Sequence, residues 1–263
     1  MIEIFLLILA GMFIGTMAGL FGIGGGLLIV PVVTYCLVYF HAVSFEVGLL
    51  SGIATSLASI VFSGLTASLT HIANRNFDSV IFQRFAIGVL FGSFTIGFYL
   101  KHIPTEIIKI CFIVYTFVAA YKIIKKQAKF SHKPFPTIIE SQLIGYIFAT
   151  ISGLIGIGGG TLFVPYLLRK NISPKLAVGI SSVLGLVIGV GSSVSLLLAA
   201  DNNSTNDMIG YIYVPAILFL TLPSLIFVKL SATWLLKIPD SAIKKSFACL
   251  LVAIGVLMLA NQY

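Results

Sequence analysis

Long apolar stretches alternate with short polar loops along the whole chain. The pattern predicts eight apolar segments. Each is long enough to cross the membrane as a helix, since about 20 helical residues span about 30 Å of hydrocarbon. Their approximate bounds are 4–40, 47–70, 79–100, 105–124, 137–168, 176–200, 209–229 and 241–260. The pattern therefore predicts an all-α polytopic membrane protein.

Two of these segments contain nearly the same glycine-rich motif. Residues 19–33 read GLFGIGGGLLIVPVV, and residues 153–167 read GLIGIGGGTLFVPYL. As one helix, segment 4–40 would be about 55 Å long, which is too long for an upright crossing. We therefore expect each motif to break its segment into a re-entrant or V-shaped pair of helices. The glycines and prolines of the two motifs are Gly22, Gly24, Gly25, Gly26 and Pro31, and Gly156, Gly158, Gly159, Gly160 and Pro165.

The likeness between the two halves continues beyond the motifs. A run of small residues follows each motif, at Ser51–Ser56 and at Ile180–Ser182, and an Ile-Pro pair precedes the last apolar segment of each half. We predict two homologous membrane repeats of four segments each. The first repeat covers 1–126, the second covers 137–263, and a basic cytoplasmic linker covers 127–136.

Loop charges predict how the halves are oriented. Lysines gather around the linker, which the positive-inside rule places in the cytoplasm, whereas loop 201–208 has two aspartates and no lysine or arginine. Both ends of segment 137–168 then lie on the cytoplasmic side. Each half makes three full crossings plus a hairpin, and the second repeat is inverted relative to the first. Eight full crossings with parallel repeats are the alternative.

The chemistry of the two breaks favours an anion. Irregular backbone at membrane depth is tolerated only inside protein or beside a water-filled cavity. The helices that follow the breaks begin near Leu27 and Thr161, and their N–H groups and dipoles attract negative charge. No carboxylate lies in the middle of a segment, where cation and proton pathways place them. The alternative is that the glycines only allow helices to pack closely.

Glycine amides and nearby hydroxyl groups are the candidate ligands of this anion. The glycines are Gly24, Gly25 and Gly26 in the first motif and Gly158, Gly159 and Gly160 in the second. The hydroxyl groups belong to Thr55, Ser56, Thr161, Ser181 and Ser182. Their alternative role is helix packing or a bond to the carbonyl four residues earlier.

Composition excludes several other classes of protein. Charged residues make up 9% of the chain and apolar residues 59%, whereas soluble domains have about 25% charged residues. The net charge of +8 is spread over short loops, so nucleic acid is not an expected partner. The three isolated cysteines form no metal-ligand pattern. We expect no cofactor and no metal site, and the absence of a polar cluster inside the apolar segments argues against an enzyme.

The doubled GIGGG-x-L-x-VP motif, each copy followed by a small-residue helix, resembles the TauE/SafE sulfite exporter family, also called the 4-toluenesulfonate uptake permease family. The resemblance implies a multi-pass permease of a bacterial or archaeal inner membrane that carries sulfite, thiosulfate or organosulfonates by alternating access. An anion-selective pore, or a transporter of another small anion or metabolite, is the alternative. The expected partners are the anionic substrate and the lipid bilayer, and a homo-oligomer is compatible with the sequence. The anion, the direction of transport and the coupling ion stay open.

Overall fold

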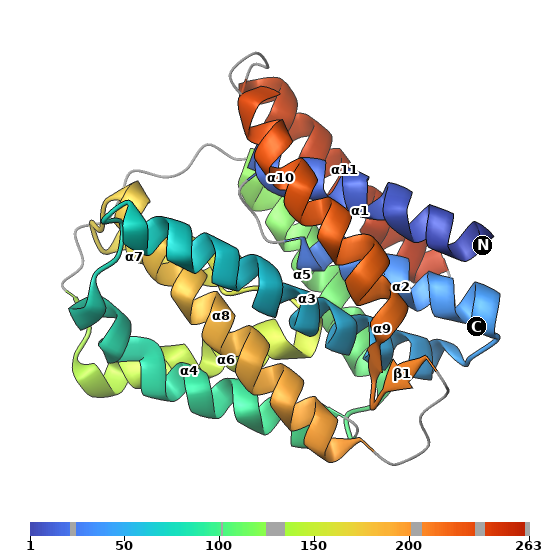
Figure 1. The fold of residues 1–263 in the computed structure, drawn as a ribbon. Helices are drawn as coiled ribbons and strands as arrows, with labels where there is room; N and C mark the ends of the chain where they lie inside the picture. The colour runs from blue at the N-terminus through green and yellow to red at the C-terminus, as the bar shows by residue number, and fades with distance from the viewer. Residues whose placement is uncertain (22–24, 101, 125–134, 201–206, 235–239, 261–263) are drawn as a thin grey trace.

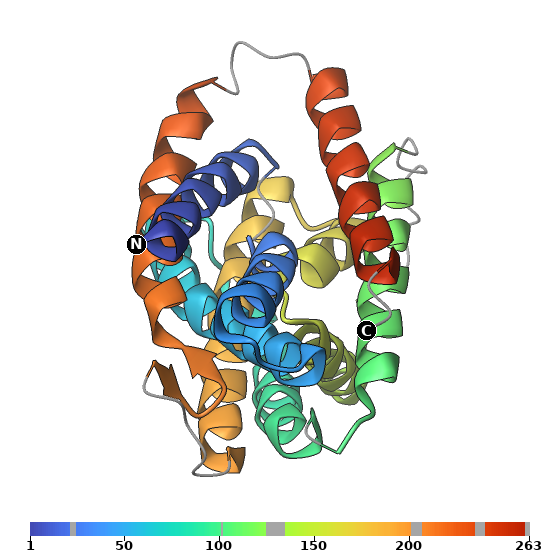
Figure 2. The same cartoon turned by 90° about the vertical axis from the view of Figure 1, so that its right-hand side faces the viewer.

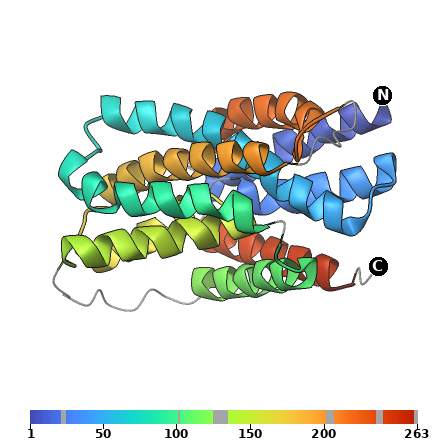
Figure 3. The ribbon, with the colours of Figure 1, turned by 90° about the horizontal axis from the view of Figure 1, so that it is seen from below.

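The protein is a bundle of helices. The computed structural model describes residues 1–21, 25–100, 102–124, 135–200, 207–234 and 240–260. The elements in chain order are α1 Ile2–Phe21, α2 Gly26–His41, α3 Phe45–Ala73, α4 Ser79–Leu100, α5 Thr105–Ile124, α6 Ile138–Ile155, α7 Gly160–Arg169, α8 Pro174–Ala199, β1 Met208–Ile209, β2 Ile212–Tyr213, α9 Val214–Ala216, the π-helix η1 Ile217–Thr221, α10 Leu222–Trp234 and α11 Asp240–Ala260. Most of the helices lie side by side along one direction, as Figure 3 shows.

Helix length and composition fit a membrane. Among the described residues, four helices, α3, α4, α6 and α8, are long and apolar enough to span the hydrocarbon by themselves. Large apolar side chains are exposed all along the outside of the bundle, among them Phe62, Phe91 and Leu198. In water such a surface would be costly, whereas lipid solvates it. The predicted all-α polytopic class is confirmed.

Each glycine motif divides its segment into two helices that turn back on each other. In the first pair, Glu3 at the start of α1 contacts His41 at the end of α2, with Nε2 3.1 Å from Oε1. In the second pair, the ring of Phe148 in α6 lies 5.6 Å from the ring of Tyr166 near the end of α7. Both segments are therefore hairpins, each with its two outer ends on one side of the bundle.

The two hairpins open toward opposite ends of the bundle. The first hairpin opens beside Tyr213, whose hydroxyl lies 3.1 Å from His41 Nε2. The second opens beside Phe85 near the start of α4, where the rings of Phe85 and Tyr166 are 6.0 Å apart. Helix α3 runs from the first end to the second, because His41 precedes it and α4 follows it. Figure 1 shows α2 and α7 at opposite ends.

The segment predicted at 209–229 is not a simple helix. It begins with an antiparallel pair, in which Met208 faces Tyr213 and Gly210 adopts a left-handed φ of 61°. A turn of π-helix, Ile217–Thr221, then precedes Pro223. Proline has no N–H and clashes with the carbonyl four residues earlier, so a wider turn accommodates it. The sequence prediction missed the strands because their apolar residues continue the hydrophobic run.

The first helix of each hairpin packs against the other half of the chain. A Cβ atom on Gly11 of α1 would lie 2.3 Å from the Leu220 carbonyl oxygen of the second half, and one on Gly145 of α6 would lie 2.7 Å from the Phe85 carbonyl oxygen of the first. Gly145 holds the same place in the second half that Gly11 holds in the first. Each hairpin therefore rests on the other half. Figure 2 shows α2 between α10 on one side and α11 and α5 on the other.

Candidate functional site

The second break is built around a helix end that requires glycine. Gly156 follows α6 with a left-handed φ of 74°, and the Ile157 N–H donates to the Ser152 carbonyl. This bond is that of a Schellman motif, which ends a helix and satisfies its last carbonyls. Helix α7 begins only at Gly160, so the backbone of 157–159 is neither part of α6 nor part of α7.

The start of α7 offers amides without backbone partners. The N–H groups of Gly158, Gly159, Gly160 and Thr161 donate to no backbone carbonyl of the described residues, whereas the Phe163 N–H already donates to the Gly159 carbonyl. A Cβ atom added at Gly160 would meet no atom within 4 Å. Free donors at a positive helix end, next to open space, form the usual binding site for an anion.

The first break lies directly against the second. A Cβ atom on Gly26 would sit 2.5 Å from the Gly156 carbonyl oxygen and 3.2 Å from Ile157 Cα. The buried Ser56 hydroxyl joins the two breaks, because it lies 2.7 Å from the Gly156 carbonyl oxygen and 3.4 Å from that of Gly26. Segments more than a hundred residues apart in sequence therefore meet at one point inside the bundle.

The two motifs are not equivalent at this point. Gly26 and Gly160 hold matched positions, yet the space beside Gly26 is filled and the space beside Gly160 is open. Gly25 is also closely packed, because a Cβ atom added there would lie 2.7 Å from Ile14 Cγ2. Gly22 and Gly24 of the first motif lie outside the described residues. The described geometry therefore leaves open space beside Gly160 of the second motif and none beside Gly26 of the first.

The candidate hydroxyl groups have different surroundings. Thr55 accepts a 2.9 Å bond from the Tyr213 N–H, and Ser182 donates to the Val178 carbonyl of its own helix. The helix-packing alternative thus describes Ser182. Ser181 is buried, and its hydroxyl has no hydrogen-bond partner among the described residues. Thr161 donates to the Gly158 carbonyl, 3.2 Å away.

Tyr115 adds a polar group that sequence reasoning missed. Its side chain, from α5, lies close enough to that of Thr161 beside the second break for the two to interact. Tyr115 sits in the middle of an apolar helix with no motif around it, so nothing in the sequence distinguishes it from an interfacial tyrosine. Only the tertiary arrangement of α5 brings Tyr115 close to Thr161.

The prolines of the motifs lie inside the helices that follow the breaks. Pro31 is buried in α2, whereas Pro165 in α7 is exposed. Each removes one backbone donor from the second turn and leaves a carbonyl near the break without a helix partner. The Thr34 hydroxyl bonds to the Val30 carbonyl beside Pro31, 2.7 Å away.

An apolar groove of about 750 Å³ lies elsewhere, between α1, α2 and α11. Its walls include Leu7, Phe13 and Leu257, and the polar side chains among the described lining residues are those of Tyr35, Cys36 and Tyr39. Such a wall suits hydrocarbon and offers almost no hydrogen bond to an anion. The groove is therefore not the candidate site.

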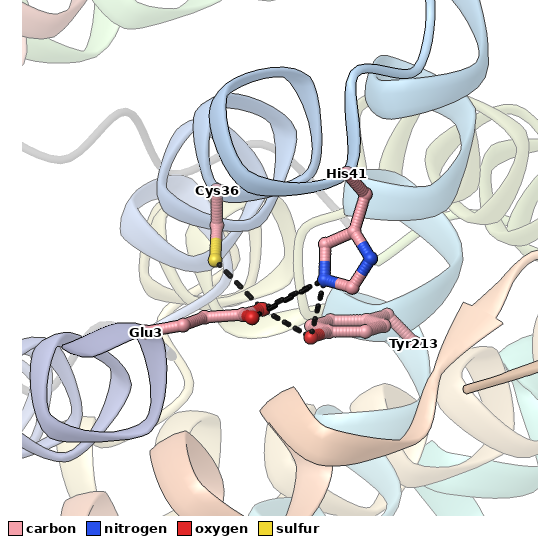
Figure 4. Close-up of polar contacts among 4 residues, drawn as sticks. All are labelled: Glu3, Cys36, His41 and Tyr213. Carbon is pink, nitrogen blue, oxygen red and sulfur yellow. Dashed lines mark hydrogen bonds and ion pairs between the residues drawn. The ribbon is translucent and has the colours of Figure 1, made fainter. Parts of the chain in front are cut away.

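A cluster of polar side chains closes the mouth of the first hairpin, as Figure 4 shows. The Glu3 carboxylate accepts hydrogen bonds from the Tyr213 hydroxyl and, at 3.4 Å, from the Cys36 thiol. His41 Nε2 lies 3.1 Å and 3.2 Å from the two carboxylate oxygens. Burial and the Glu3 charge raise the pKa of the Tyr213 phenol, so this hydroxyl stays protonated and donates.

No group of three or more described His, Cys, Asp or Glu side chains has the arrangement of a metal site. Arg84, the basic residue deepest in a segment, donates to the Pro136 carbonyl, 3.2 Å away, and lies over the Phe135 ring. It is therefore held at the end of the bundle and does not reach the breaks.

Long apolar helices and two broken hairpins that meet in the interior define a membrane transporter. Comparison with known proteins gives the same class. The family model described as "Sulfite exporter TauE/SafE" matches residues 7–258. The chain belongs to the TauE/SafE sulfite exporter family.

Curated relatives agree with this assignment. The chain is 32% identical over 262 residues to a "probable membrane transporter protein" of Haemophilus influenzae, with 97% of each chain covered. A protein of the same description from Methanocaldococcus jannaschii is 29% identical over 260 residues, covering 97% of this chain and 94% of the relative. No solved structure matches the chain. The protein is thus a multi-pass membrane transporter and not an enzyme.

Proposed function

We propose that this transporter carries small sulfur-containing oxyanions, such as sulfite, thiosulfate and organosulfonates, through the plasma membrane of a bacterium or archaeon. The observation that supports this proposal is the set of amides at Gly158–Thr161 that donate to no backbone carbonyl of the described residues, beside the open space at Gly160. Sulfur oxyanions carry several acceptor oxygens around one centre, which suits several N–H donors that converge from a helix start.

Charge around the breaks supports an anion over a cation. The described carboxylates, among them Glu46, Asp78, Glu106 and Glu140, lie at helix ends or in loops. An anion at the second break would therefore face two positive helix ends, and none of the described carboxylates lies in the middle of a helix.

The proposed mechanism is alternating access between two inverted repeats, 1–126 and 137–263, with 127–136 as linker. Two observations support it. The hairpins open toward opposite ends of the bundle, and each packs on the other half through Gly11 and Gly145. Rocking of one repeat against the other around the point where the breaks meet would expose the anion to each side in turn.

Flux through reconstituted vesicles tests the proposed function. Purified protein should catalyse saturable uptake and counterflow of labelled thiosulfate, sulfite or ethanesulfonate, with chloride as the comparison anion. Single-channel currents in place of counterflow would show a pore. Absence of flux for every sulfur oxyanion would refute the proposed substrate class.

The variant Gly160→Ala ties that flux to the second break. Its methyl group enters open space, so the fold should be unaffected while the anion loses room beside the amides. Loss of one bond to a charged group corresponds to about a tenfold or greater rise in the half-saturating concentration. Gly159→Val is a poorer test, because an added Cβ would already lie 3.1 Å from the Gly185 nitrogen. Unchanged half-saturation in Gly160→Ala would place the anion elsewhere.

A further inference from the structure

The side chain of Tyr213 fills the mouth of the first hairpin. It comes from β2 of the second half, and the residue is only 2% exposed. Its hydroxyl donates to the Glu3 carboxylate of α1 and lies 3.1 Å from His41 Nε2 of α2, as Figure 4 shows. The rings of Tyr213 and His41 also meet edge to face, with 5.4 Å between their centroids. One side chain of the second half is thus held by both helices of the first hairpin.

The backbone of Tyr213 is fixed to α3 on its other side. Its N–H donates to the Thr55 hydroxyl, 2.9 Å away, and Thr55 is fully buried. Thr55 is next to Ser56, whose hydroxyl joins the two breaks, and neighbours in a helix differ in height by only about 1.5 Å. Tyr213 therefore extends from the level of the breaks on α3 to the outer ends of α1 and α2.

A buried hydroxyl without a partner lies on the same face of α3. Ser51 comes one turn before Thr55, nearer the mouth of the hairpin, so both side chains belong to one face of the helix. Ser51 is 0% exposed, and its hydroxyl has no hydrogen-bond partner among the described residues. A buried polar group without a partner costs free energy, and native proteins keep few of them. Water along this face of α3 in another state of the transporter would satisfy the Ser51 hydroxyl.

We propose that Tyr213 is a gate at the first end of the bundle, held closed by Glu3 and His41. When the gate opens, the face of α3 that carries Ser51 and Thr55 becomes a water-filled passage to the breaks. This inference rests on alternating access, which is part of the proposed function, and it names the group that closes one side. It holds for any solute that the breaks bind.

The charge of Glu3 keeps the gate closed. Burial by itself would raise the pKa of Glu3, but the hydrogen bonds from Tyr213, His41 and Cys36 lower it. The carboxylate is therefore ionised at neutral pH, and the Tyr213 hydroxyl donates to a charged acceptor. A hydrogen bond to a charged group changes an equilibrium by about tenfold or more. Loss of this bond should shift the population from closed to open by the same factor.

Labelling of a thiol at position 51 tests the gate without any anion. The native cysteines are replaced by serine, and Cys36→Ser keeps a donor beside Glu3. Ser51→Cys then adds one thiol at a position that has no hydrogen bond to lose among the described residues. A membrane-impermeant thiol reagent is added to vesicles on the side from which Asp207→Cys reacts, because Asp207 lies beside β2 at the first end. The rate of labelling reports how often the gate is open.

Two substitutions in this parent should open the gate, and two matched ones should not. Glu3→Gln removes a charge and Tyr213→Phe removes one hydroxyl, and both keep the size of the side chain. Each should raise the labelling rate by about tenfold or more. Glu46→Gln and Tyr39→Phe are the controls, because both residues are exposed at the same end of the bundle. Their labelling rates should equal that of the parent.

A second thiol position separates gate opening from general loosening of the fold. Ser68 lies in the same helix near the second end, is 2% exposed and has no hydrogen-bond partner among the described residues. With Ser68→Cys in place of Ser51→Cys, labelling from the first side should stay slow in Glu3→Gln and in Tyr213→Phe. Faster labelling at both positions would show a loosened fold and overturn the gate.

The outcomes decide the gate and the proposed function separately. Equal rates at position 51 in the parent, Glu3→Gln and Tyr213→Phe would overturn the gate, and so would an equal rise in the control variants. If Glu3→Gln fails gel filtration, Tyr213→Phe decides alone, because its ring still packs on His41. Absence of sulfur-oxyanion flux in the wild type would refute the proposed substrate class and leave the labelling result unchanged.

Discussion

The matched glycines Gly26 and Gly160 should respond in opposite ways to the same substitution. In Gly26→Ala, the new methyl would lie 2.5 Å from the Gly156 carbonyl oxygen and 3.0 Å from the Ser56 hydroxyl oxygen. The carbonyl belongs to the backbone of the other hairpin and can move only if the hairpins separate. In Gly160→Ala, the methyl has no neighbour within 4 Å.

The size of the difference follows from these contacts. Overpacking of a tight interior costs about 1–3 kcal/mol, and alanine in place of glycine in a helix recovers about 0.5–1 kcal/mol. Gly26→Ala should therefore lose about 1–2 kcal/mol of stability, whereas Gly160→Ala should lose none. For a chain of this size, about 1 kcal/mol moves the midpoint by about 2–4 °C.

The assay is thermal unfolding of both variants in the same detergent without added anion, with gel filtration to check that each is monodisperse. Gly26→Ala should unfold several degrees below the wild type, and Gly160→Ala at or above it. Equal midpoints for the two variants, or a lower midpoint for Gly160→Ala, would refute the arrangement in which the first break is packed and the second is open.

Two further predictions concern the hydroxyl groups and the orientation. Ser56→Ala should lower the free energy of unfolding in detergent by about 1–3 kcal/mol, because it leaves the buried Gly156 carbonyl without its donor. Ser182→Ala should leave that free energy nearly unchanged, because the Ser182 hydroxyl bonds only within its own helix. Equal losses in the two variants would contradict the bridging role of Ser56. In a chain without its native cysteines, single cysteines at the exposed positions Asn74 and Asp207 should react with an impermeant thiol reagent from opposite sides of the membrane. Labelling from the same side would exclude inverted repeats.

Much of the fold could be predicted from hydropathy. The predicted segments 79–100 and 105–124 coincide with α4 and α5, because each is an apolar run with polar residues at both ends. The breaks were also predictable, since glycine and proline act on the local backbone. The strands at 208–213 were not, because a short apolar strand and the start of an apolar helix have the same composition.

The candidate site was predictable in position and not in detail. Five hydroxyl groups stood near the motifs, yet Ser56 joins the breaks, Thr55 holds Tyr213 and Ser182 bonds within its own helix. These roles depend on which helix faces each hydroxyl. Glu3 and His41 lie at segment ends, where isolated polar residues are ordinary, so the sequence offered no reason to pair them.

The sequence alone determined that the chain spans a membrane, where its helices break and to which family it belongs, because apolar length, glycine and proline are local properties. The tertiary structure decided how tightly each copy of the motif is packed, which two nearly identical sequences cannot show. Two nearly identical motifs became unlike, with Gly26 pressed against the other hairpin and Gly160 beside open space. The physical reason is that two hairpins cannot both occupy the same point in the bundle. The first hairpin fills that point with Gly26, and Gly160 of the second hairpin lies beside the space that remains.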